Sequence, residues 1–344
     1  MEFKKFIFYL LIFNFFFLII VIFLFLFNPK LFYFRSWEYF DDFVYTGIAK
    51  KQHLFYETGD LSRGYIFQRY GELNTITIND LGNRIACYDK TKKKSFLLLG
   101  DSAMFGSNIS DKNTLPKLLC KKYPELSFYN GSRTLELDLL RLSEFKFDSL
   151  IITAPEFAGF NRYCAVLDNF KSRKKINLDI EQLKIKKDTN NLDIYSKLIK
   201  RPIKYLSFKL NVIFDTSKTI YPPSEHLFLH RNLQQNEINE LNCIKNLNNY
   251  FKDLQIKTLF FYFPEKRTVL DKNYINKNFK KTYITSIGKK LSDLGINYFD
   301  VSKCLKKDNL GNLEFYHFHD THMTSEGMQN LSKCLINKKN KFFS

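Results

Sequence analysis

Short apolar segments alternate with helical patterns from residue 95 to the C terminus, and this alternation restricts the fold more than any other feature of the sequence. Each apolar segment has the length and composition of a buried strand. Strands that are joined by crossover helices form a parallel sheet. The predicted strands are 95–99, 126–129, 150–153, 258–262 and 296–299, and the predicted helices are 114–123, 135–142, 237–254, 274–294 and 325–336.

We therefore predict one α/β domain over residues 91–344, with a flavodoxin-like, doubly wound parallel sheet of about five strands. The stretch from about 160 to 235 is rich in Lys and Asn and interrupts the third crossover. It is interpreted as an insertion that forms either a cap over the site or a surface close to the membrane.

The N-terminal region contains a long apolar run at residues 6–27, which follows a short tail of residues 1–5 and is interrupted only by Asn14. As a helix this run is roughly 33 Å long, enough to cross a bilayer. A cleaved signal peptide has a shorter apolar region and small residues at its cleavage site, whereas this run ends in Phe27-Asn28-Pro29-Lys30. A buried core helix rarely has so long an apolar surface on all sides. We predict an uncleaved, single-pass transmembrane helix.

The orientation of this helix depends on the charges that flank it. Lys4 and Lys5 lie at one end, and Lys30 and Arg35 lie at the other. The short leading tail favours a cytoplasmic N terminus, which places the rest of the chain, from about residue 28, on the extracytoplasmic side, in the periplasm or at the cell surface. Residues 28–90 are predicted as a juxtamembrane segment without strong periodicity.

The chain is strongly basic, with 53 Lys and Arg against 35 Asp and Glu and a formal net charge of +18. This charge favours anionic surroundings such as lipid headgroups, phosphorylated glycans or acidic polysaccharide. Nucleic acid is not an expected partner of a membrane-anchored domain outside the cytoplasm. A general bias towards Lys, Asn, Ile and Phe explains the excess of lysine equally well.

Cysteine usage permits a disulfide but does not identify one. The spacing lacks the C-x-x-C pattern of zinc or redox sites. Cys120, Cys243 and Cys334 lie in apolar helical patterns and are interpreted as small core residues. The six cysteines are Cys87, Cys120, Cys164, Cys243, Cys304 and Cys334.

The first candidate for chemistry is Ser102, in the sequence Gly100-Asp101-Ser102 directly after the first predicted strand. Ligands of open parallel sheets bind at the carboxyl ends of the strands. Gly100 and Gly106 allow a sharp turn around this serine. The same tripeptide is also common as an ordinary turn with an N-cap serine, so it predicts a nucleophile only together with a suitable base.

A suitable base follows the fifth predicted strand, where Asp320-Thr321-His322 precedes a helix. A hydroxyl group is a poor nucleophile until a base removes its proton, and an imidazole oriented by a carboxylate is the usual base. We predict that Ser102, His322 and Asp320 form a catalytic triad.

Two other interpretations of charged residues remain open. His317, His319, Asp320 and His322 crowd together as zinc ligands do, but no second ligand cluster is evident, and we expect neither a metal nor a cofactor. His317 and His319 are interpreted as polar loop residues. Arg133 and Arg162 could steer an anionic substrate or be solvated surface charges.

These motifs resemble the SGNH/GDSL hydrolase superfamily. Gly100–Gly106 matches its first block, GDSxxxG, and Asp320, His322 and Gly327 match its last block. The resemblance covers roughly residues 79 to 340 apart from the insertion, and Asn79–Arg84 is similar to a segment that precedes the nucleophile strand in many anchored members.

The resemblance also implies where an oxyanion would be stabilised. Its second block corresponds to residues 129–132, where the Gly131 N–H would join that of Ser102 in an oxyanion hole. The family's third block, Gly-x-Asn-Asp, is replaced here by a sequence that contains Glu156, which cannot donate a hydrogen bond when ionised. The third donor is missing, replaced by Asn161, or supplied by the insertion, and losing one such donor costs ~2.7–4 kcal/mol.

The two-residue spacing of Asp320 and His322 resembles the anchored alginate O-acetyltransferase branch, which works on exported polysaccharide. This resemblance implies a serine-dependent ester hydrolase or O-acyltransferase that acts on acyl esters, chiefly acetyl esters, of cell-envelope glycans. A transferase there needs a membrane protein that delivers an acyl donor. Two alternatives are a lipid esterase or thioesterase at the membrane surface and a non-catalytic glycan-binding or assembly protein. In the non-catalytic case, Ser102 and His322 would not approach hydrogen-bond distance.

Overall fold

The fold is built around a parallel sheet of four strands in the order β4-β3-β5-β8. The strands are β3 (Ser95–Leu99), β4 (Ser127–Asn130), β5 (Ser149–Pro155) and β8 (Lys257–Phe263). An isolated parallel bridge between Phe260 and Tyr298 extends the sheet beyond β8. The computed structural model describes residues 2–27, 52–60, 70–79, 83–131, 145–156, 158–172, 220–221, 226–227, 237–265, 269, 280–301, 304, 315–317 and 322–344.

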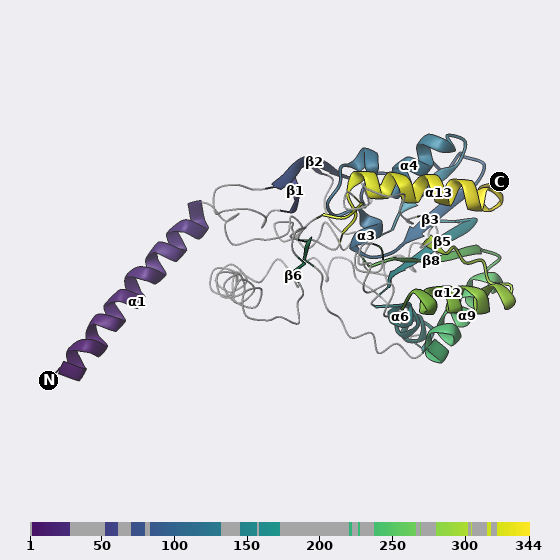
Figure 1. The fold of residues 1–344 in the computed structure, drawn as a ribbon. Coiled ribbons are helices and arrows are strands. Elements are labelled where there is room, and N and C mark those ends of the chain that lie inside the picture. Colours follow the sequence, from purple (N-terminus) through teal and green to yellow (C-terminus); the bar gives the residue numbers. More distant parts are fainter. Residues whose placement is uncertain are drawn as a thin grey trace.

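Helices cover both faces of the sheet, as the alternation of apolar segments predicted (Figure 1). Phe96 and Leu98 of β3 pack in a core with α4 (Leu115–Lys122) and α13 (Ser325–Phe343). Leu97 and Leu99 point to the other face, towards α6 (Asn161–Ser172), α9 (Glu237–Asp253) and α12 (Lys280–Asp293). Because successive side chains of a strand point to opposite faces, a strand buried at every position such as β3 requires both layers. The flavodoxin-like, doubly wound fold is confirmed.

Two predicted elements differ from the observed structure. The strand predicted at 296–299 is reduced to the single bridge at Tyr298. The predicted insertion begins with α6, whose Tyr163 and Leu167 are buried in the core under α9, so this helix belongs to the domain's own layer. Two short strands, β6 (Ile220–Tyr221) and β7 (His226–Leu227), pair later in the same stretch. The helix predicted at 135–142 lies outside the described residues.

The segment before the domain contains an antiparallel hairpin that the sequence analysis missed. β1 (Gln52–Asp60) pairs with β2 (Tyr70–Ile78) along its whole length. Ile76 and Ile78 are fully buried, whereas Thr75 and Thr77 are half-buried. This two-residue period is the signal that identifies a half-buried strand, and the description of residues 28–90 as a segment without strong periodicity missed it.

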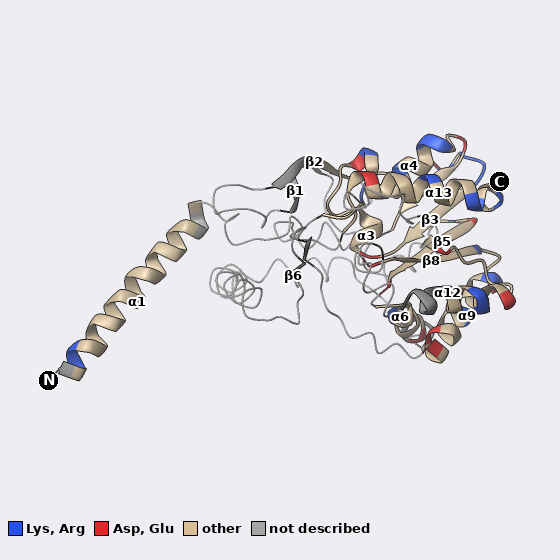
Figure 2. Cartoon of the chain, in the orientation of Figure 1, with Lys and Arg blue, Asp and Glu red and all other residues tan. Residues whose placement is uncertain are grey.

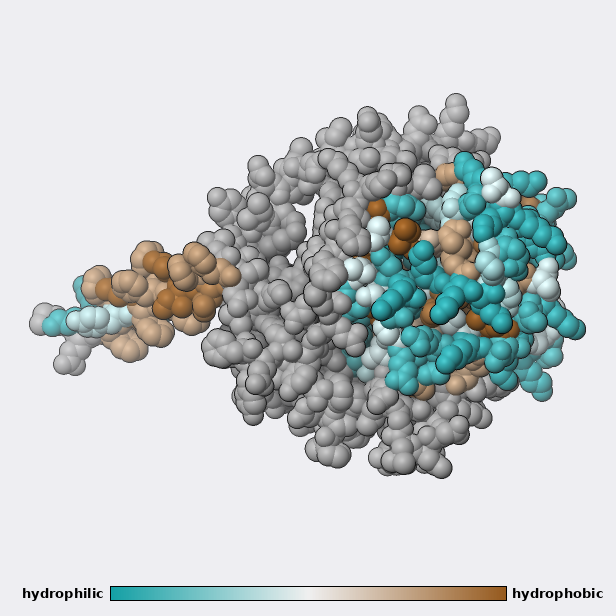
Figure 3. Space-filling view, turned by 90° about the horizontal axis from the view of Figure 1, so that it is seen from above, coloured by the Kyte–Doolittle hydropathy of each residue, from teal (hydrophilic) through white to brown (hydrophobic). Residues whose placement is uncertain are grey.

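The N-terminal helix α1 (Glu2–Phe27) is long and apolar enough to cross a membrane over Phe3–Leu24, and none of this span is buried. Figure 3 shows its apolar surface beside the mainly hydrophilic described surface of the domain. The lack of burial disfavours the alternative of a core helix, because a core helix packs against other elements.

All six cysteines form disulfides. Cys120, Cys243 and Cys334 lie in or against the core as predicted, but each is bonded to a second cysteine, which the prediction did not include. An apolar helical pattern shows that a cysteine faces the interior, but it does not show which residue faces it there. The three disulfides are Cys87–Cys120, Cys164–Cys243 and Cys304–Cys334.

Candidate active site

Ser102 lies at the carboxyl end of β3 and is the first residue of the short helix α3 (Ser102–Phe105). The Asp101 carboxylate caps this helix by accepting a hydrogen bond from the Ala103 N–H at 2.9 Å. Gly106 ends the helix in the left-handed region, with φ of 76°, which glycine adopts without steric cost. Ser102 is therefore held at a sharp strand-to-helix turn, and its N–H lies in a first turn that has no intrahelical acceptors.

Gly100 is required at this turn because there is no room for a side chain. A Cβ at Gly100 would overlap Met104 and lie 2.5 Å from Thr153 Oγ1. We expect Gly100→Ala to destabilise the protein by about 1–3 kcal/mol, because the buried neighbours must move. Thermal or denaturant unfolding measures this loss. Gly295→Ala is the comparison, because no atom lies within 4 Å of that Cβ and its cost comes only from the positive φ of 69°. An equal loss in both variants would contradict the steric explanation.

His322 lies directly beside Ser102. Its Nε2 is 2.7 Å from Ser102 Oγ, although the two residues are 220 positions apart in the sequence. Both side chains are half-buried, so a substrate can reach them. This distance is within the range expected of a nucleophile and its general base.

The loop that carries His322 is fixed at its base. Tyr316 and Met323 form an antiparallel bridge, and the His317 N–H donates to the His322 carbonyl at 3.2 Å. The Tyr316 hydroxyl donates to the Pro264 carbonyl at 2.8 Å. The position of the imidazole is thus set by paired backbone on both sides of the loop tip, and α13 begins directly after it.

The tip of this loop, residues 318–321, lies outside the described residues and includes Asp320 and His319. The predicted role of Asp320 therefore stays a prediction. His317 is buried, with 7 % of its surface exposed, instead of being an ordinary polar loop residue. Within the described residues, no group of three or more His, Cys, Asp or Glu side chains could hold a metal.

Gly131 is not available as an oxyanion donor. Its N–H donates to the Leu98 carbonyl at 2.8 Å and so continues the pairing of β4 with β3. The predicted role of the Gly131 N–H was wrong, because a backbone donor already paired within the sheet cannot also point to a substrate. Gly131 does lie at the carboxyl edge of the sheet, directly after β4. Its N–H is still paired, because the hydrogen bonding between β4 and β3 continues one residue beyond the strand.

Glu156 and Asn161 follow β5 in different environments. Glu156 is 1 % exposed, and its carboxylate accepts a hydrogen bond from the Glu265 N–H at 2.7 Å. Burial first, and then the charges of Glu156 and Glu265, raise the pKa of Tyr316 well above its ordinary value. Glu156 thus joins β5 to the segment after β8. Asn161 is exposed at the start of α6, and its role as an oxyanion donor stays a prediction.

Arg84 is a fully buried residue that the sequence analysis did not single out as functional. A guanidinium group has five N–H donors. Its Nε donates to Asp111 Oδ1 at 2.7 Å, which forms a salt bridge. The remaining donors reach the carbonyl groups of Thr75, Phe105, Gly106 and Ile109. Arg84 therefore joins β2 to the loop that follows Ser102. Arg84 is the last residue of the Asn79–Arg84 segment, and the resemblance of that segment was the sequence signal that could have identified it.

Three sets of contacts hold the first turn of α6 in place beside the site. The buried carboxylate of Glu240 accepts hydrogen bonds from the Phe160 N–H at 2.5 Å and the Tyr262 hydroxyl at 2.6 Å. The Tyr163 hydroxyl donates to the Thr153 carbonyl at 2.6 Å. The disulfide Cys164–Cys243 joins the same turn to α9. Burial raises the pKa of Glu240 despite these hydrogen bonds.

This turn presents Arg162 at the carboxyl edge of the sheet. The guanidinium, which is partly covered by its neighbours, lies 4.7 Å from the centre of the Tyr163 ring and donates to the Tyr163 hydroxyl at 2.8 Å. The connection continues through Thr153, whose hydroxyl donates to the Leu99 carbonyl at 3.0 Å. Burial disfavours the charged form of Arg162, but attraction to Tyr163 and Asp101 outweighs it and raises the pKa of the guanidinium. A permanent positive charge therefore lies close to the turn that carries Asp101 and Ser102.

Comparisons with known proteins do not assign this chain to a family. No protein-family model matches the chain, and no curated protein matches it. A solved structure from Desulfitobacterium hafniense DCB-2, assigned to the "G-D-S-L family" of lipolytic proteins, is similar with 12 % sequence identity and a TM-score of 0.37. The alignment covers 70 % of this chain and 97 % of that chain.

Proposed function

We propose that this protein is a membrane-anchored, serine-dependent ester hydrolase or O-acyltransferase that acts on acyl esters of cell-envelope glycans. The observation that carries the proposal is the 2.7 Å contact between Ser102 Oγ and His322 Nε2. The non-catalytic alternative required these two side chains to lie out of reach of each other, so this contact favours an enzyme.

In the proposed mechanism, Ser102 Oγ attacks the ester carbonyl while its proton moves to His322 Nε2. The negative charge on the carbonyl oxygen is stabilised by the Ser102 N–H, and Asn161 is the candidate second donor. The intermediate collapses, the C–O bond to the alcohol breaks, and His322 returns the proton to the leaving alcohol. Water or a sugar hydroxyl then attacks the acyl-enzyme with His322 as the base, which gives hydrolysis or transfer. Asp320 is proposed to hold the imidazole through Nδ1.

Two features support a location outside the cytoplasm. α1 provides one candidate membrane span. Three disulfides use every cysteine of the chain, and disulfides persist in oxidising compartments such as the periplasm and cell surface. Together they favour an anchor with the domain on the extracytoplasmic side.

Arg162 favours substrates that carry a negative charge near the ester. We expect Arg162→Gln to lower kcat/KM for 4-acetoxybenzoate by about 5- to 30-fold, because a charge–charge contact near a protein surface contributes roughly 1–2 kcal/mol. The neutral ester phenyl acetate has no such contact, and its kcat/KM should change less than about twofold. Arg162→Lys keeps the charge and should recover part of the loss. Equal losses for both esters would show that Arg162 acts on the catalytic turn and not on the substrate.

The proposal is tested by labelling the full-length protein in detergent with a fluorophosphonate, which reacts with activated serines. We expect one adduct, located at Ser102 by peptide mass spectrometry. Ser102→Ala should remove it, and His322→Ala should slow its formation strongly because the hydroxyl loses its base. A folded wild-type protein that neither labels nor cleaves an acetyl ester would overturn the enzymatic proposal.

A further inference from the structure

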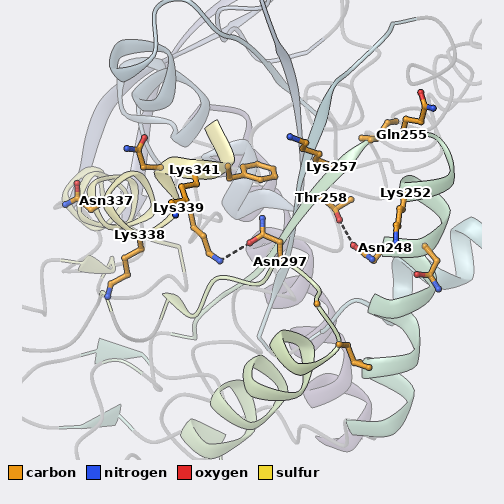
Figure 4. A pocket seen from close by; sticks show the side chains of 16 residues that line it. Asn248, Lys252, Gln255, Lys257, Thr258, Asn297, Asn337, Lys338, Lys339 and Lys341 are labelled. Atoms are coloured by element: carbon orange, nitrogen blue, oxygen red, sulfur yellow. Dashed lines mark hydrogen bonds between the residues drawn. The ribbon is translucent and has the colours of Figure 1, made fainter. Parts of the chain in front are cut away.

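A cavity of about 1000 Å³ lies at the end of the sheet opposite Ser102 (Figure 4). The C-terminal ends of α9, α12 and α13 surround it, and Lys257 and Thr258, the first residues of β8, contribute to its wall. Because β3, β5 and β8 are parallel, the cavity lies at their amino-terminal edge, whereas Ser102 follows the carboxyl edge. A strand of this length separates the two edges by roughly 20 Å. The cavity is therefore distinct from the candidate active site.

The cavity is lined by five lysines and by no acidic residue. No Asp or Glu lines it, although Asp253 and Asp293 are adjacent in the sequence to lining segments. Among the described residues, none of these lysines forms a salt bridge. Figure 2 shows Lys and Arg on the ends of α13, α9 and α12 at this side of the domain, with acidic residues beside them at the ends of α9 and α12. Charges of one sign around a concave surface attract a ligand of the opposite sign. The lysines are Lys252, Lys257, Lys338, Lys339 and Lys341.

One of these lysines is held in place and partly removed from water. Lys339 Nζ donates to Asn297 Oδ1 at 2.8 Å, and the side chain is half-buried. Burial lowers the pKa of Lys339. An amide oxygen offsets only part of the cost of burying an ammonium group. An anionic group bound in the cavity would supply the missing counter-charge.

The rest of the lining suits a carbohydrate better than a lipid. Side-chain amides, among them Asn248, Gln255 and Asn337, offer both donors and acceptors, as sugar hydroxyls require. Only Ile256, Leu294 and Phe342 provide large apolar surface, which is too little to cover an acyl chain. Phe342 packs against the rings of Phe96 and Phe343 and remains partly exposed.

We propose that this lysine-lined cavity binds a segment of an anionic polysaccharide, through carboxylate or phosphate groups that repeat along the chain. The inference rests on the proposed function, because it names the polymer that carries the ester. A polymer held about 20 Å from Ser102 presents its other units to the site at a raised effective concentration. The two sites together would select an acylated, negatively charged glycan over a small neutral ester.

The test measures binding by isothermal titration calorimetry with the full-length protein in discs of neutral phosphatidylcholine. The probes are an oligogalacturonate, which carries carboxylates, a glycerol phosphate polymer of similar length, and a neutral maltooligosaccharide. The variant that removes the charge of three cavity lysines, called the groove variant, is Lys257→Gln/Lys338→Gln/Lys341→Gln. The matched control, Lys121→Gln/Lys245→Gln/Lys289→Gln, removes three exposed lysines that do not line the cavity.

We expect at least one anionic probe to bind, with an affinity that falls as salt is added. The probe that binds more tightly identifies carboxylate or phosphate as the recognised group. The groove variant should bind it about tenfold or more weakly, and the control less than about twofold more weakly. Cleavage of phenyl acetate should be unchanged in both variants, so loss of the proposed enzymatic activity would be seen separately.

Three results would overturn this inference. The first is that neither anionic probe binds, and the second is that the control variant loses as much affinity as the groove variant, which would show a general effect of net charge. The third is equal binding of the neutral maltooligosaccharide. Lysine-dependent binding of the wild-type protein to added anionic vesicles but to neither polymer would instead assign the surface to lipid headgroups.

Discussion

We expect Ser102→Ala to lower kcat/KM for a generic acetyl ester by roughly 10⁴- to 10⁶-fold, and His322→Ala to lower it by a similar factor. In the proposed mechanism the two groups act as one unit, because the Ser102 hydroxyl is activated by the imidazole that lies 2.7 Å away. The double variant should therefore lose little more than either single variant. Residual activity would come from binding and from oxyanion stabilisation, which neither substitution removes.

Ser107→Ala is the matched control for this experiment. The Ser107 hydroxyl donates to the Ser102 carbonyl at 3.0 Å, so this serine lies close to the nucleophile without being activated by His322. We expect the kcat/KM of the Ser107→Ala variant to fall less than about tenfold, because one neutral hydrogen bond contributes about 0.5–1.5 kcal/mol. Circular dichroism and thermal unfolding would establish that all variants are folded. Additive losses in the double variant would mean that Ser102 and His322 do not act as nucleophile and base.

Removal of the Arg84 side chain should produce the largest loss of stability. Arg84→Met leaves Asp111 without its cation and removes the donors to four backbone carbonyls. Breaking a buried ion pair from one side costs about 3–5 kcal/mol. Because a domain is stable by only about 5–15 kcal/mol, the variant is expected to unfold far below the wild-type temperature or to be recovered poorly.

Arg84→Lys keeps this experiment informative if the methionine variant does not fold. Lysine retains the charge but offers three donors where arginine offers five. We expect it to fold with a loss of about 1–3 kcal/mol and with a reduced kcat, because the loop after Ser102 is less firmly held. Arg162→Met, which removes a partly covered guanidinium, should cost about 1 kcal/mol or less. Comparable losses at Arg84 and Arg162 would show that the buried network is not important for stability.

Periodicity was enough to predict the central sheet. The run Phe96–Leu99 is apolar at every position, so it had to be buried on both faces, and the structure places it between two helical layers. The fifth strand was less predictable, because at residues 296–299 only Tyr298 makes a bridge. The extent of pairing at a sheet edge depends on the neighbouring strand, which the sequence of one segment does not contain.

The candidate site was predictable at the level of residues but not of geometry. The position of Ser102 after a strand and of His322 before a helix followed from local pattern, because both motifs stand at element boundaries. Gly131 showed the limit of this reasoning, since its N–H is used by Leu98 in the sheet. Whether a backbone group is free is a property of its spatial neighbours.

The sequence by itself determined the layered α/β fold, the apolar helix at the N terminus and the two segments that carry the proposed nucleophile and base. Only the tertiary structure decided which residues meet. It determined the partners of all six cysteines, the acceptors around Arg84, the contact of Arg162 with Tyr163 and the lysines that line the cavity. The physical reason is the range of each signal. Strand and helix periods arise from neighbours a few positions apart, whereas disulfides, buried ion pairs and cavities join residues brought together only by folding.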